Sequence, residues 1–205
     1  AEDLAEARRG CEAIERAATR IDTILERLTV RRVDPTPIRC PLAIGPTVAE
    51  IVKDLQQTTA TELRFVQHAD PTVTIAADPS QIVRGISNLI SNALRFSPAG
   101  APVEEAVRTD MHWADIEVSD EGPGVDPAHL ALIFLKHGRA HPDGPGSGLG
   151  LYIARQIARA HGGTVLVRNR PAGRGASFAI RLPVRTADRD DPTRRCGGRV
   201  RTRRG

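Results

Sequence analysis

Asn88-Leu-Ile-Ser-Asn92-Ala-Leu-Arg95-Phe96 is the first of three stretches that decide the fold of this chain; the others are Asp120-Glu-Gly122-Pro-Gly124 and Gly146-Ser-Gly148-Leu149-Gly150-Leu151. Each stretch alone is a weak signal, because polar helix faces, turns and glycine-rich runs are common. The order of the three stretches along the chain is what makes them informative about the fold. About one helix and a pair of strands separate them, so they can converge on one pocket.

The first stretch lies in a helical pattern that Asp78 opens as an N-cap residue. At about 100° per residue, Asn88, Asn92 and Arg95 fall within about 60° of one another, opposite an apolar face. Asparagine is a poor residue for a helix interior unless its side chain has a task. The stripe fits either an ordinary solvated face or a functional one, in which an amide oxygen coordinates Mg²⁺ and Arg95 lies near phosphates.

The second stretch follows an alternation of apolar and polar residues over 113–119, which predicts a half-buried strand ending at Asp120. Gly122 and Gly124 then let the backbone turn sharply and approach a ligand closely. A simple strand-to-loop turn explains the same residues. In the functional interpretation, the Asp120 carboxylate accepts a hydrogen bond from an exocyclic amine, and the site rejects purines that lack this amine.

The third stretch runs directly into a helical pattern over 148–161. A glycine-rich loop at a helix N-terminus offers unpaired N–H groups and a favourable dipole to phosphate oxygens. His161 is expected at the helix C-terminus, where the dipole favours it and no catalytic part is implied. Together, the three stretches outline a nucleotide pocket with adenine, metal and phosphate sites.

In this order the stretches resemble the N, G1 and G2 boxes of the ATP-binding domain of sensor histidine kinases, in the superfamily shared with gyrase, Hsp90 and MutL. The similarity covers roughly residues 40–184 and closes with Gly173-Arg-Gly-Ala-Ser-Phe178-Ala-Ile-Arg-Leu182-Pro183, which is similar to the terminal strand of the family. Together these motifs are highly specific. The resemblance implies an enzyme, a protein histidine kinase that uses ATP and Mg²⁺.

Carried over by position, the resemblance implies a role for each matching residue. Asn92 would be the Mg²⁺ ligand, and Arg95 would contact the phosphates. Asp120 would bind the adenine amine, with Gly122 and Gly124 beneath the base. The glycines of the third stretch would lie along the triphosphate. The other residues expected to bind ATP are Asn88, Phe96, Val125, Gly146, Ser147, Gly148, Leu149, Gly150, Leu151 and Ser177.

Two departures from the family pattern affect the expected chemistry. ATP-hydrolysing members of the superfamily carry a glutamate four residues before the metal-binding asparagine, where this chain has Asn88. Without that general base, transfer of the phosphoryl group to a protein acceptor is favoured over hydrolysis. The lid expected over 125–145 contains Ile133-Phe-Leu-Lys-His-Gly-Arg139 and lacks the family's second phenylalanine and its acidic residue. Arg139 is still expected to reach the phosphates as a catalytic residue.

Residues 1–30 carry apolar residues at alternating steps of three and four, an unbroken heptad seam. One helix cannot bury such a seam alone, so a homodimer or heteromer through this segment is expected. The segment resembles the second helix of the hairpin through which sensor kinases dimerise. No histidine precedes His68, and the phosphoacceptor is therefore expected outside this chain. It would lie in another part of a longer protein or in a separate His-bearing partner.

The net positive charge of the chain comes from its C-terminal end. Residues 185–205 hold eight Arg and three Asp, whereas residues 1–184 carry a net charge of −1. This composition predicts a disordered tail, and no specific contact with nucleic acid is expected. Three scattered cysteines fit neither a disulfide framework nor a zinc site, and the lid histidines at 129, 137 and 141 are too widely spaced for zinc. A reducing cytoplasm and no membrane span are expected.

The resulting expectation is an α+β two-layer sandwich, a mixed sheet with helices on one face, preceded by a long heptad-patterned helix. Its parts are a partial dimerisation helix at 1–34, an ATP-binding kinase domain at 35–184 and a basic tail at 185–205. Helices are expected near 45–58, 79–96 and 148–161. Strands are expected near 62–67, 73–76, 102–108, 113–119, 163–169 and 175–182.

Three functions compete for this pocket. The first is the catalytic part of a two-component sensor histidine kinase, whose further partner would be the receiver domain of a response regulator. The second is a serine kinase of the kind that binds sigma factors; the heptad helix and the Arg95-Phe96 pair favour the histidine kinase over it. The third is a nucleotide-binding pseudokinase or regulatory module, which the unusual lid sequence favours.

Overall fold

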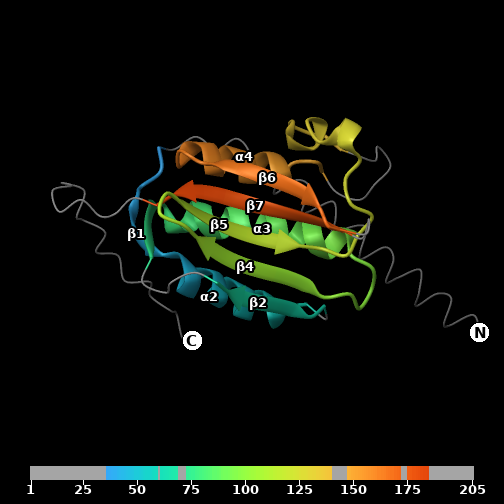
Figure 1. The fold of residues 1–205 in the computed structure, drawn as a ribbon, viewed down its shortest axis with the longest axis horizontal. Coiled ribbons are helices and arrows are strands. Elements are labelled where there is room, and N and C mark those ends of the chain that lie inside the picture. Colours follow the sequence, from blue (N-terminus) through green and yellow to red (C-terminus); the bar gives the residue numbers. More distant parts are fainter. Residues whose placement is uncertain (1–35, 60, 69–72, 140–146, 172–174, 185–205) are drawn as a thin grey trace, which may run out of the picture.

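The computed structural model describes residues 36–59, 61–68, 73–139, 147–171 and 175–184, and their main feature is a five-stranded sheet (Figure 1). The sheet runs in the order β2-β4-β5-β7-β6, and only its β2–β4 pair is parallel. Its strands are β2 (Leu63–Gln67), β4 (Val103–Thr109), β5 (Trp113–Ser119), β6 (Thr164–Asn169) and β7 (Ala176–Pro183).

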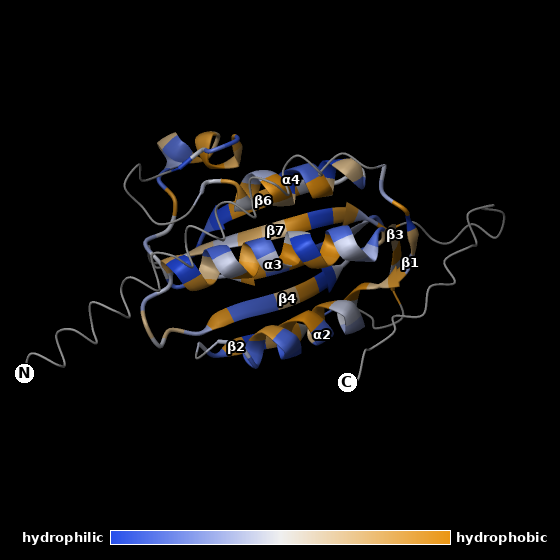
Figure 2. Cartoon of the chain, turned by 180° about the vertical axis from the view of Figure 1, so that it is seen from behind, coloured by the Kyte–Doolittle hydropathy of each residue, from blue (hydrophilic) through white to orange (hydrophobic). Residues whose placement is uncertain are grey.

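Three helices cover one face of this sheet: α2 (Ile44–Gln56), α3 (Pro79–Phe96) and α4 (Gly150–Ala160). Figure 2 shows them side by side in front of the strands, with α3 between the other two. Their apolar faces pack against the inward residues of the strands, which form one hydrophobic core. The predicted α+β two-layer sandwich is therefore confirmed for the described residues.

The sequence predicted each of these helices and strands to within two residues of its observed ends. It missed β1 (Cys40–Ala43), which pairs antiparallel with β3 (Thr74–Ala77) in a separate two-stranded sheet. β1 has four residues, one of them Pro41, and shows too little alternation to predict a strand. Residues 40–43 form a strand because they pair with β3. The predicted helix at 1–34 and the tail at 185–205 lie outside the described residues.

The start of α3 and the end of α4 are joined by hydrogen bonds. Asp78 caps α3 as predicted, since its Oδ1 accepts from the backbone N–H groups of Ser80 at 3.0 Å and Gln81 at 3.2 Å. The backbone N–H of Asp78 donates in turn to Nε2 of His161, at 3.0 Å. Nδ1 of His161 lies 2.8 Å from the carbonyl oxygen of Ile157 and donates to it, because Nε2 is an acceptor.

This geometry corrects the expectation for His161. The residue does lie at the C-terminus of α4, but it is buried, and burial lowers the pKa of its imidazole below the ordinary value. The ring of His161 therefore joins two helices through hydrogen bonds, and it is not a cation that interacts with the dipole of α4.

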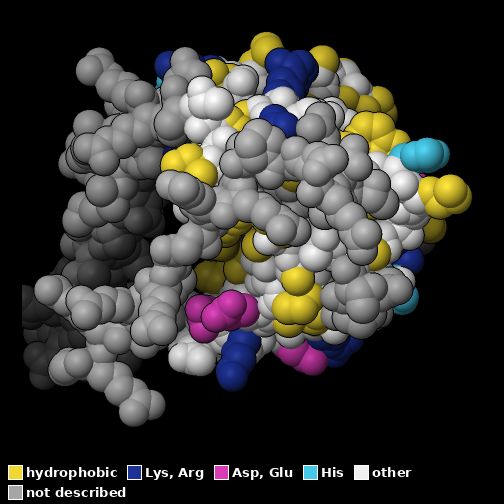
Figure 3. Space-filling model, turned by 90° about the vertical axis from the view of Figure 1, so that its left-hand side faces the viewer, with side chains coloured by type: hydrophobic (Ala, Val, Ile, Leu, Met, Phe, Trp, Pro, Cys, Tyr) yellow, Lys and Arg dark blue, Asp and Glu magenta, His cyan; other side chains and the backbone are white. Residues whose placement is uncertain are grey.

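The described surface carries mixed charge. On the face drawn in Figure 3, basic side chains lie at the top and bottom and acidic ones near the lower edge, so neither sign forms a single patch. On the outer face of the sheet, Arg181 pairs with Asp115 at 2.6 Å and Arg108 pairs with Glu117 at 3.4 Å. Among the described residues, no helix combines the length and the apolar character needed to cross a membrane.

Candidate functional site

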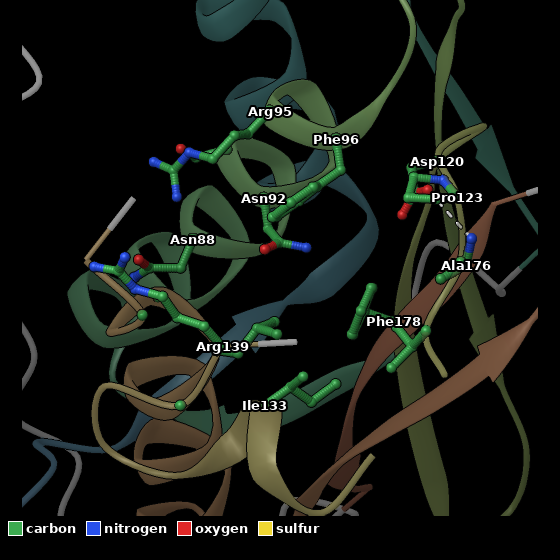
Figure 4. Close-up of a pocket in the computed structure, with 17 residues that line it drawn as sticks. Asn88, Asn92, Arg95, Phe96, Asp120, Pro123, Ile133, Arg139, Ala176 and Phe178 are labelled. Atoms are coloured by element: carbon green, nitrogen blue, oxygen red, sulfur yellow. Dashed lines mark hydrogen bonds between the residues drawn. The ribbon is translucent and has the colours of Figure 1, made fainter. Parts of the chain in front are cut away.

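The C-terminal half of α3, the loop after β5, the lid, the start of α4 and the start of β7 line one pocket (Figure 4). Segments that are far apart in the sequence therefore meet as the order of the three stretches predicted. Of the expected site residues, those that line this pocket are Asn88, Asn92, Arg95, Phe96, Asp120, Gly124, Val125, Arg139, Gly148, Gly150 and Leu151.

Four expected residues lie near the pocket without lining it, and Gly146 lies outside the described residues. Gly122 lies directly beneath Asp120, as described below. Ser147 is buried, and its Oγ accepts a hydrogen bond from the backbone N–H of Leu149 at 3.2 Å. The Leu149 side chain is fully buried in the core. Ser147 and Leu149 thus shape the loop before α4 from beneath.

The side chain of Ser177 lies on the wrong face for the role expected of it. Its Oγ donates to Glu117 and accepts from Ser119 Oγ at 3.1 Å, on the outer face of the sheet. Its neighbours Ala176 and Phe178 line the pocket. Successive strand residues point to opposite faces, so the expectation that Ser177 contacts the nucleotide is wrong by one residue in register.

Sequence reasoning missed six residues that line the pocket. Ala176 and Phe178 alternate along β7 with the buried Ile180, so a period of two could have placed them on the inner face. Pairing of β7 with β5 brings them beside Asp120. The other four, which had no comparable signal, are Ser91, Pro123, Ile133 and Gly138.

Asp120 is a buried carboxylate at the end of β5. Its Oδ1 accepts hydrogen bonds from the backbone N–H groups of Gly122 at 2.8 Å and Ala176 at 3.2 Å. Burial raises the pKa of Asp120, and these two hydrogen bonds oppose the rise. In Figure 4 the carboxylate faces the space between Asn92 and Phe178. With Oδ1 held by the backbone, Oδ2 is available to accept a hydrogen bond from a ligand.

Two glycines make this position of Asp120 possible. A Cβ on Gly122 would lie 2.6 Å from the carbonyl oxygen of Phe96 and 2.9 Å from Asp120 Oδ1. A Cβ on Gly175 would lie 1.9 Å from the carbonyl oxygen of Asp120. Such distances are too short for any side chain. The loop therefore fits between α3 and β7 only with glycine at both positions.

The polar stripe of α3 faces the pocket from the opposite wall. Asn92 points toward the centre of the space in Figure 4, and Arg95 lies one turn further along the helix. Asn88 Nδ2 donates to the carbonyl oxygen of Arg84 at 2.8 Å. A Cβ on Gly150 would lie 3.2 Å from Asn88 Oδ1, so α3 and α4 approach closely here. The stripe therefore lies on a wall of the pocket.

The start of α4 offers backbone donors to the pocket. No side chain caps the helix at Leu149, and Gly148 and Gly150 line the pocket. The first N–H groups of a helix have no partner inside it, and they carry the positive end of the helix dipole. This arrangement suits a phosphate group. The described residues of the third stretch are therefore placed where they could donate hydrogen bonds to a phosphate in the pocket.

The described part of the lid contains two short 3-10 turns, η1 (Pro127–His129) and η2 (Leu132–Phe134). Arg155 of α4 lies over the ring of Phe134, 5.8 Å from its centre. His137 has a left-handed backbone with φ of 63°, and its Nδ1 lies 3.3 Å from the carbonyl oxygen of Ser147. The lid thus contacts the loop that precedes α4, and Arg139 lines the pocket.

The residues present fit a Mg²⁺ ion bound together with phosphates. Asn92 supplies an amide oxygen on the pocket wall, and Mg²⁺ is usually held by one or two protein oxygens plus substrate phosphates. The described residues contain no group of three or more His, Cys, Asp or Glu side chains that could hold a metal without such phosphates.

Comparisons with known sequences place this chain among nucleotide-binding proteins. Residues 77–186 match the family described as histidine kinase-, DNA gyrase B-, and HSP90-like ATPase. The sensor histidine kinase CusS of Escherichia coli K12 is 36% identical over 141 residues, which are 67% of this chain and 28% of CusS. The sensor protein kinase PmrB of Pseudomonas aeruginosa is 29% identical over 194 residues, 91% of this chain and 40% of PmrB.

Solved structures show the same fold. The mycobacterial sensor histidine kinase MprB matches with a TM-score of 0.62 and 27% identity, over 72% of this chain and 98% of that one. Full-length ShkA, solved in complex with AMPPNP, matches with a TM-score of 0.63 and 27% identity, over 73% of this chain and 32% of that one. The chain spans 28% to 40% of the length of CusS and PmrB.

Proposed function

Because this chain belongs to the family of histidine kinase-, DNA gyrase B-, and HSP90-like ATPases, we propose that it is the ATP-binding catalytic part of a two-component sensor histidine kinase. It would transfer the γ-phosphoryl group of ATP to a histidine that lies outside the chain. The observation that carries the proposal is the convergence of Asn92, Asp120 and the start of α4 on one pocket. The sensor kinases CusS and PmrB are similar to it in sequence.

The proposed adenine site is the carboxylate of Asp120. Backbone N–H groups hold Oδ1, and Oδ2 would accept from the exocyclic amine of adenine. Val125, Ile133 and Phe178 give the pocket apolar walls against which a purine ring can pack. Guanine carries a carbonyl where adenine carries this amine, and an acceptor facing an acceptor is unfavourable. The site would therefore select adenine nucleotides.

The proposed phosphate site lies between α3, α4 and the lid. Asn92 would hold Mg²⁺, which when bound would neutralise part of the phosphate charge. Arg95 and Arg139 line the pocket and would contribute charge-assisted hydrogen bonds. The uncapped start of α4 would receive the remaining phosphate oxygens. Positioning and electrostatic stabilisation supply most of the catalysis in phosphoryl transfer.

Transfer is proposed over hydrolysis because of Asn88. Its side-chain amide donates to the Arg84 carbonyl, and an amide cannot take a proton from water as a carboxylate does. In the proposed step the bond between the γ-phosphorus and its bridging oxygen breaks, and ADP leaves. A nitrogen of the acceptor imidazole forms the new bond to phosphorus, and its proton passes to a carboxylate beside the acceptor.

The proposed partners follow from the part that the chain represents in its relatives. The acceptor histidine would belong to a dimerisation domain, in the same protein or in a separate one, and the phosphoryl group would pass on to a response regulator receiver domain. Residues 1–30 would join such a dimer or heteromer through their heptad seam. Because ATP is a cytoplasmic substrate, the cytoplasm is the proposed location of this domain.

A second function is favoured by one observation in the lid. His137 lies in the lid sequence 133–139, which lacks the second phenylalanine of the family pattern. Its Nδ1 contacts the Ser147 carbonyl oxygen by a hydrogen bond. A lid held in this way could bind nucleotide without supporting transfer. The alternative is therefore a nucleotide-binding regulatory module, and the same assay separates the two functions.

The test is incubation of the chain with γ-labelled ATP, Mg²⁺ and a separate dimerisation domain that carries a histidine beside a carboxylate. We expect label on the partner that survives alkaline electrophoresis and disappears in an acid wash, as phosphohistidine does. Acid-stable label would identify a serine kinase. Tight ATP binding without transfer to any partner would favour the regulatory module. No ATP binding by calorimetry would refute the proposed pocket.

A further inference from the structure

Asn169, the last residue of β6, clamps the backbone of Val125. Its Oδ1 accepts a hydrogen bond from the Val125 N–H at 2.8 Å, and its Nδ2 donates to the Val125 carbonyl oxygen at 2.7 Å. The amide thereby reproduces the pair of hydrogen bonds that two residues exchange across an antiparallel ladder. We propose that Asn169 is a positioning residue that holds the loop 120–125 in its nucleotide-binding shape. This inference rests on the proposed ATP-binding function.

The loop 120–125 needs an external support. It lies between the end of β5 and η1 and belongs to no helix or strand. Gly124 adopts a left-handed backbone, with φ of 76°, and glycine loses more conformational freedom on ordering than other residues. Gly124 and Val125 both line the pocket. Without a support at this end, Gly124 and Val125 would no longer hold one conformation on the base side of the pocket, even if Asp120 stayed in place.

The two ends of the loop are held separately. At the first end, the backbone N–H of Asp120 donates to the Ala176 carbonyl oxygen at 2.9 Å, which continues the pairing of β5 with β7. At the second end, the clamp of Asn169 on Val125 takes the place of a strand partner. Because the second hold is a side chain, one substitution removes it and leaves the sheet intact.

Packing around the clamp is close. A Cβ on Gly124 would lie 3.0 Å from Asn169 Oδ1. The next residue, Arg170, reaches the Asp120 carbonyl oxygen with Nη1 at 3.4 Å and Glu104 with Nη2 at 3.4 Å. The end of β6 thus contacts both ends of the loop. The shorter and paired hydrogen bonds of Asn169 make it the main support.

The position of the clamp predicts which ligands depend on it. Val125 lies on the base side of the pocket, whereas the phosphate side is formed by α4 and the lid. Loss of the clamp should therefore weaken ATP, ADP and adenosine by the same factor. In the transfer reaction it should raise KM for ATP and leave kcat at saturating ATP unchanged, since the reacting phosphate is held elsewhere.

The experiment uses the full chain with Asn169→Ala and Asn169→Asp. Alanine removes both hydrogen bonds. Aspartate keeps an acceptor for the Val125 N–H but sets a second oxygen against the Val125 carbonyl. The matched control is Arg168→Ala, because Arg168 is the exposed neighbour that pairs with Ser177 across β6 and β7. Calorimetry would measure the Kd of ATP, ADP and adenosine. Hydrogen exchange would follow the Val125 amide without nucleotide.

We expect both Asn169 variants to bind all three ligands about tenfold more weakly, which is about 1.4 kcal/mol, and to exchange the Val125 amide faster. Arg168→Ala should match the parent. Unchanged affinity and exchange in both variants would overturn the proposal, as would a weakening confined to ATP. If the parent chain bound no nucleotide, the proposed function would fail. The exchange rate of the Val125 amide would still decide whether Asn169 holds the loop.

Discussion

Asp120 and Glu105 are two buried carboxyl groups with opposite surroundings, and they show what single residues decide in this protein. Two backbone N–H groups hold Asp120 Oδ1. Neither oxygen of Glu105 has a hydrogen-bond partner in the described part of the chain. Burial raises the pKa of both groups, that of Glu105 to about 8. Asp120 is thus arranged to accept a hydrogen bond from a ligand, whereas the buried carboxyl group of Glu105 lowers the free energy of unfolding.

Asp120→Asn should weaken ATP about 100-fold. The oxygen of asparagine can still accept from Gly122 and Ala176, so the loop should keep its shape, while the amide NH₂ would face the adenine amine and set donor against donor. Loss of a hydrogen bond to a charged group, with a donor left unpaired, costs about 3 kcal/mol. Calorimetry with ATP and GTP provides the measurement. Equal affinity of the parent for both nucleotides would show that Asp120 does not read the base.

Glu105→Gln should stabilise the protein more as the pH rises. The pKa of Glu105 is about 8 in the folded state and near 4.5 in the unfolded chain. The folded state therefore holds the proton more tightly, so stability is highest below pH 4.5 and falls as the pH rises through 8. Glutamine removes this titration. We expect a gain of about 4 kcal/mol at pH 8 and almost none at pH 4.

Urea unfolding at the two pH values would measure this difference for Glu105→Gln. Glu50→Gln is the matched control, because Glu50 is an exposed carboxylate on α2. A gain that stayed constant between pH 4 and pH 8 would mean that Glu105 does not carry a raised pKa in the folded protein.

At the scale of elements, α3 and α4 act as a joined pair. His161 links the end of α4 to the start of α3, and the opposite ends of both helices line the pocket. Arg39 adds a further contact, since its Nη2 donates to the Ala160 carbonyl oxygen at 2.7 Å. The relative position of the two helical walls of the pocket therefore depends on a junction at the far end of the pair.

His161 should make this junction sensitive to acid. Burial lowers the pKa of His161 below 6.5 in the folded state, so below pH 6.5 the unfolded chain takes up the proton first. The stability contributed by the neutral ring is complete above pH 6.5 and is lost as the pH falls through the folded pKa. The thermal midpoint of the parent should fall between pH 6.5 and pH 5. This part of the pH dependence should vanish in His161→Asn and persist in His112→Asn, a control at an exposed histidine.

The lid provides a second prediction at this scale. His137→Gly removes the contact to Ser147 but suits the left-handed backbone, whereas His137→Asn tolerates that backbone and keeps a donor at the same bond distance from Cβ. We expect glycine to weaken ATP about three- to fivefold, about 1 kcal/mol, with adenosine unaffected and asparagine close to the parent. Calorimetry with both ligands decides. Parent-like ATP binding in His137→Gly would show that this contact does not hold the lid.

At the scale of the whole molecule, the described residues form a pocket, and the two described histidines nearest to α4 and its preceding loop are not placed to accept a phosphoryl group. His161 is buried with both ring nitrogens engaged. Nδ1 of His137 lies 3.3 Å from the Ser147 carbonyl oxygen, in the loop before α4. Transfer requires an acceptor in line with the γ-phosphate, and the ring nitrogens named here, both of His161 and Nδ1 of His137, are engaged in other contacts.

The chain alone should therefore bind ATP and remain unlabelled by γ-labelled ATP. Label should appear only when a partner supplies a histidine with an adjacent carboxylate. Alkaline electrophoresis followed by an acid wash gives the measurement. Acid-labile label on the isolated chain that disappears in His137→Ala or His141→Ala would contradict the prediction and place the acceptor in the lid.

Local sequence signals predicted most of the fold. The period of 3.6 in α3 and the period of two in β5 survive in the structure because tertiary packing buries the same faces that the patterns indicate. Asn92 was predicted from the same period, because it lies on the polar face of α3, whereas Asp120 and Gly150 were predicted from their positions at element ends. A polar residue or a glycine at the point where a regular pattern ends or breaks indicates a turn or a binding role, and this can be read from the local sequence.

Tertiary contacts decided the rest, and the sequence by itself could not have shown it. β1 exists only because β3 lies beside it, and the direction of Ser177 depends on the register of β7 against β5. Asn169 holds Val125 across 44 residues of sequence, and His161 reaches Asp78 across 83. Glu105 looks like an ordinary strand residue until the helices cover it and remove its water. The sequence by itself determined most of the elements and the residue types that meet in the pocket, because both follow from local periodicity and motif order. Only the structure decided which polar groups found partners, because this depends on what packs against them.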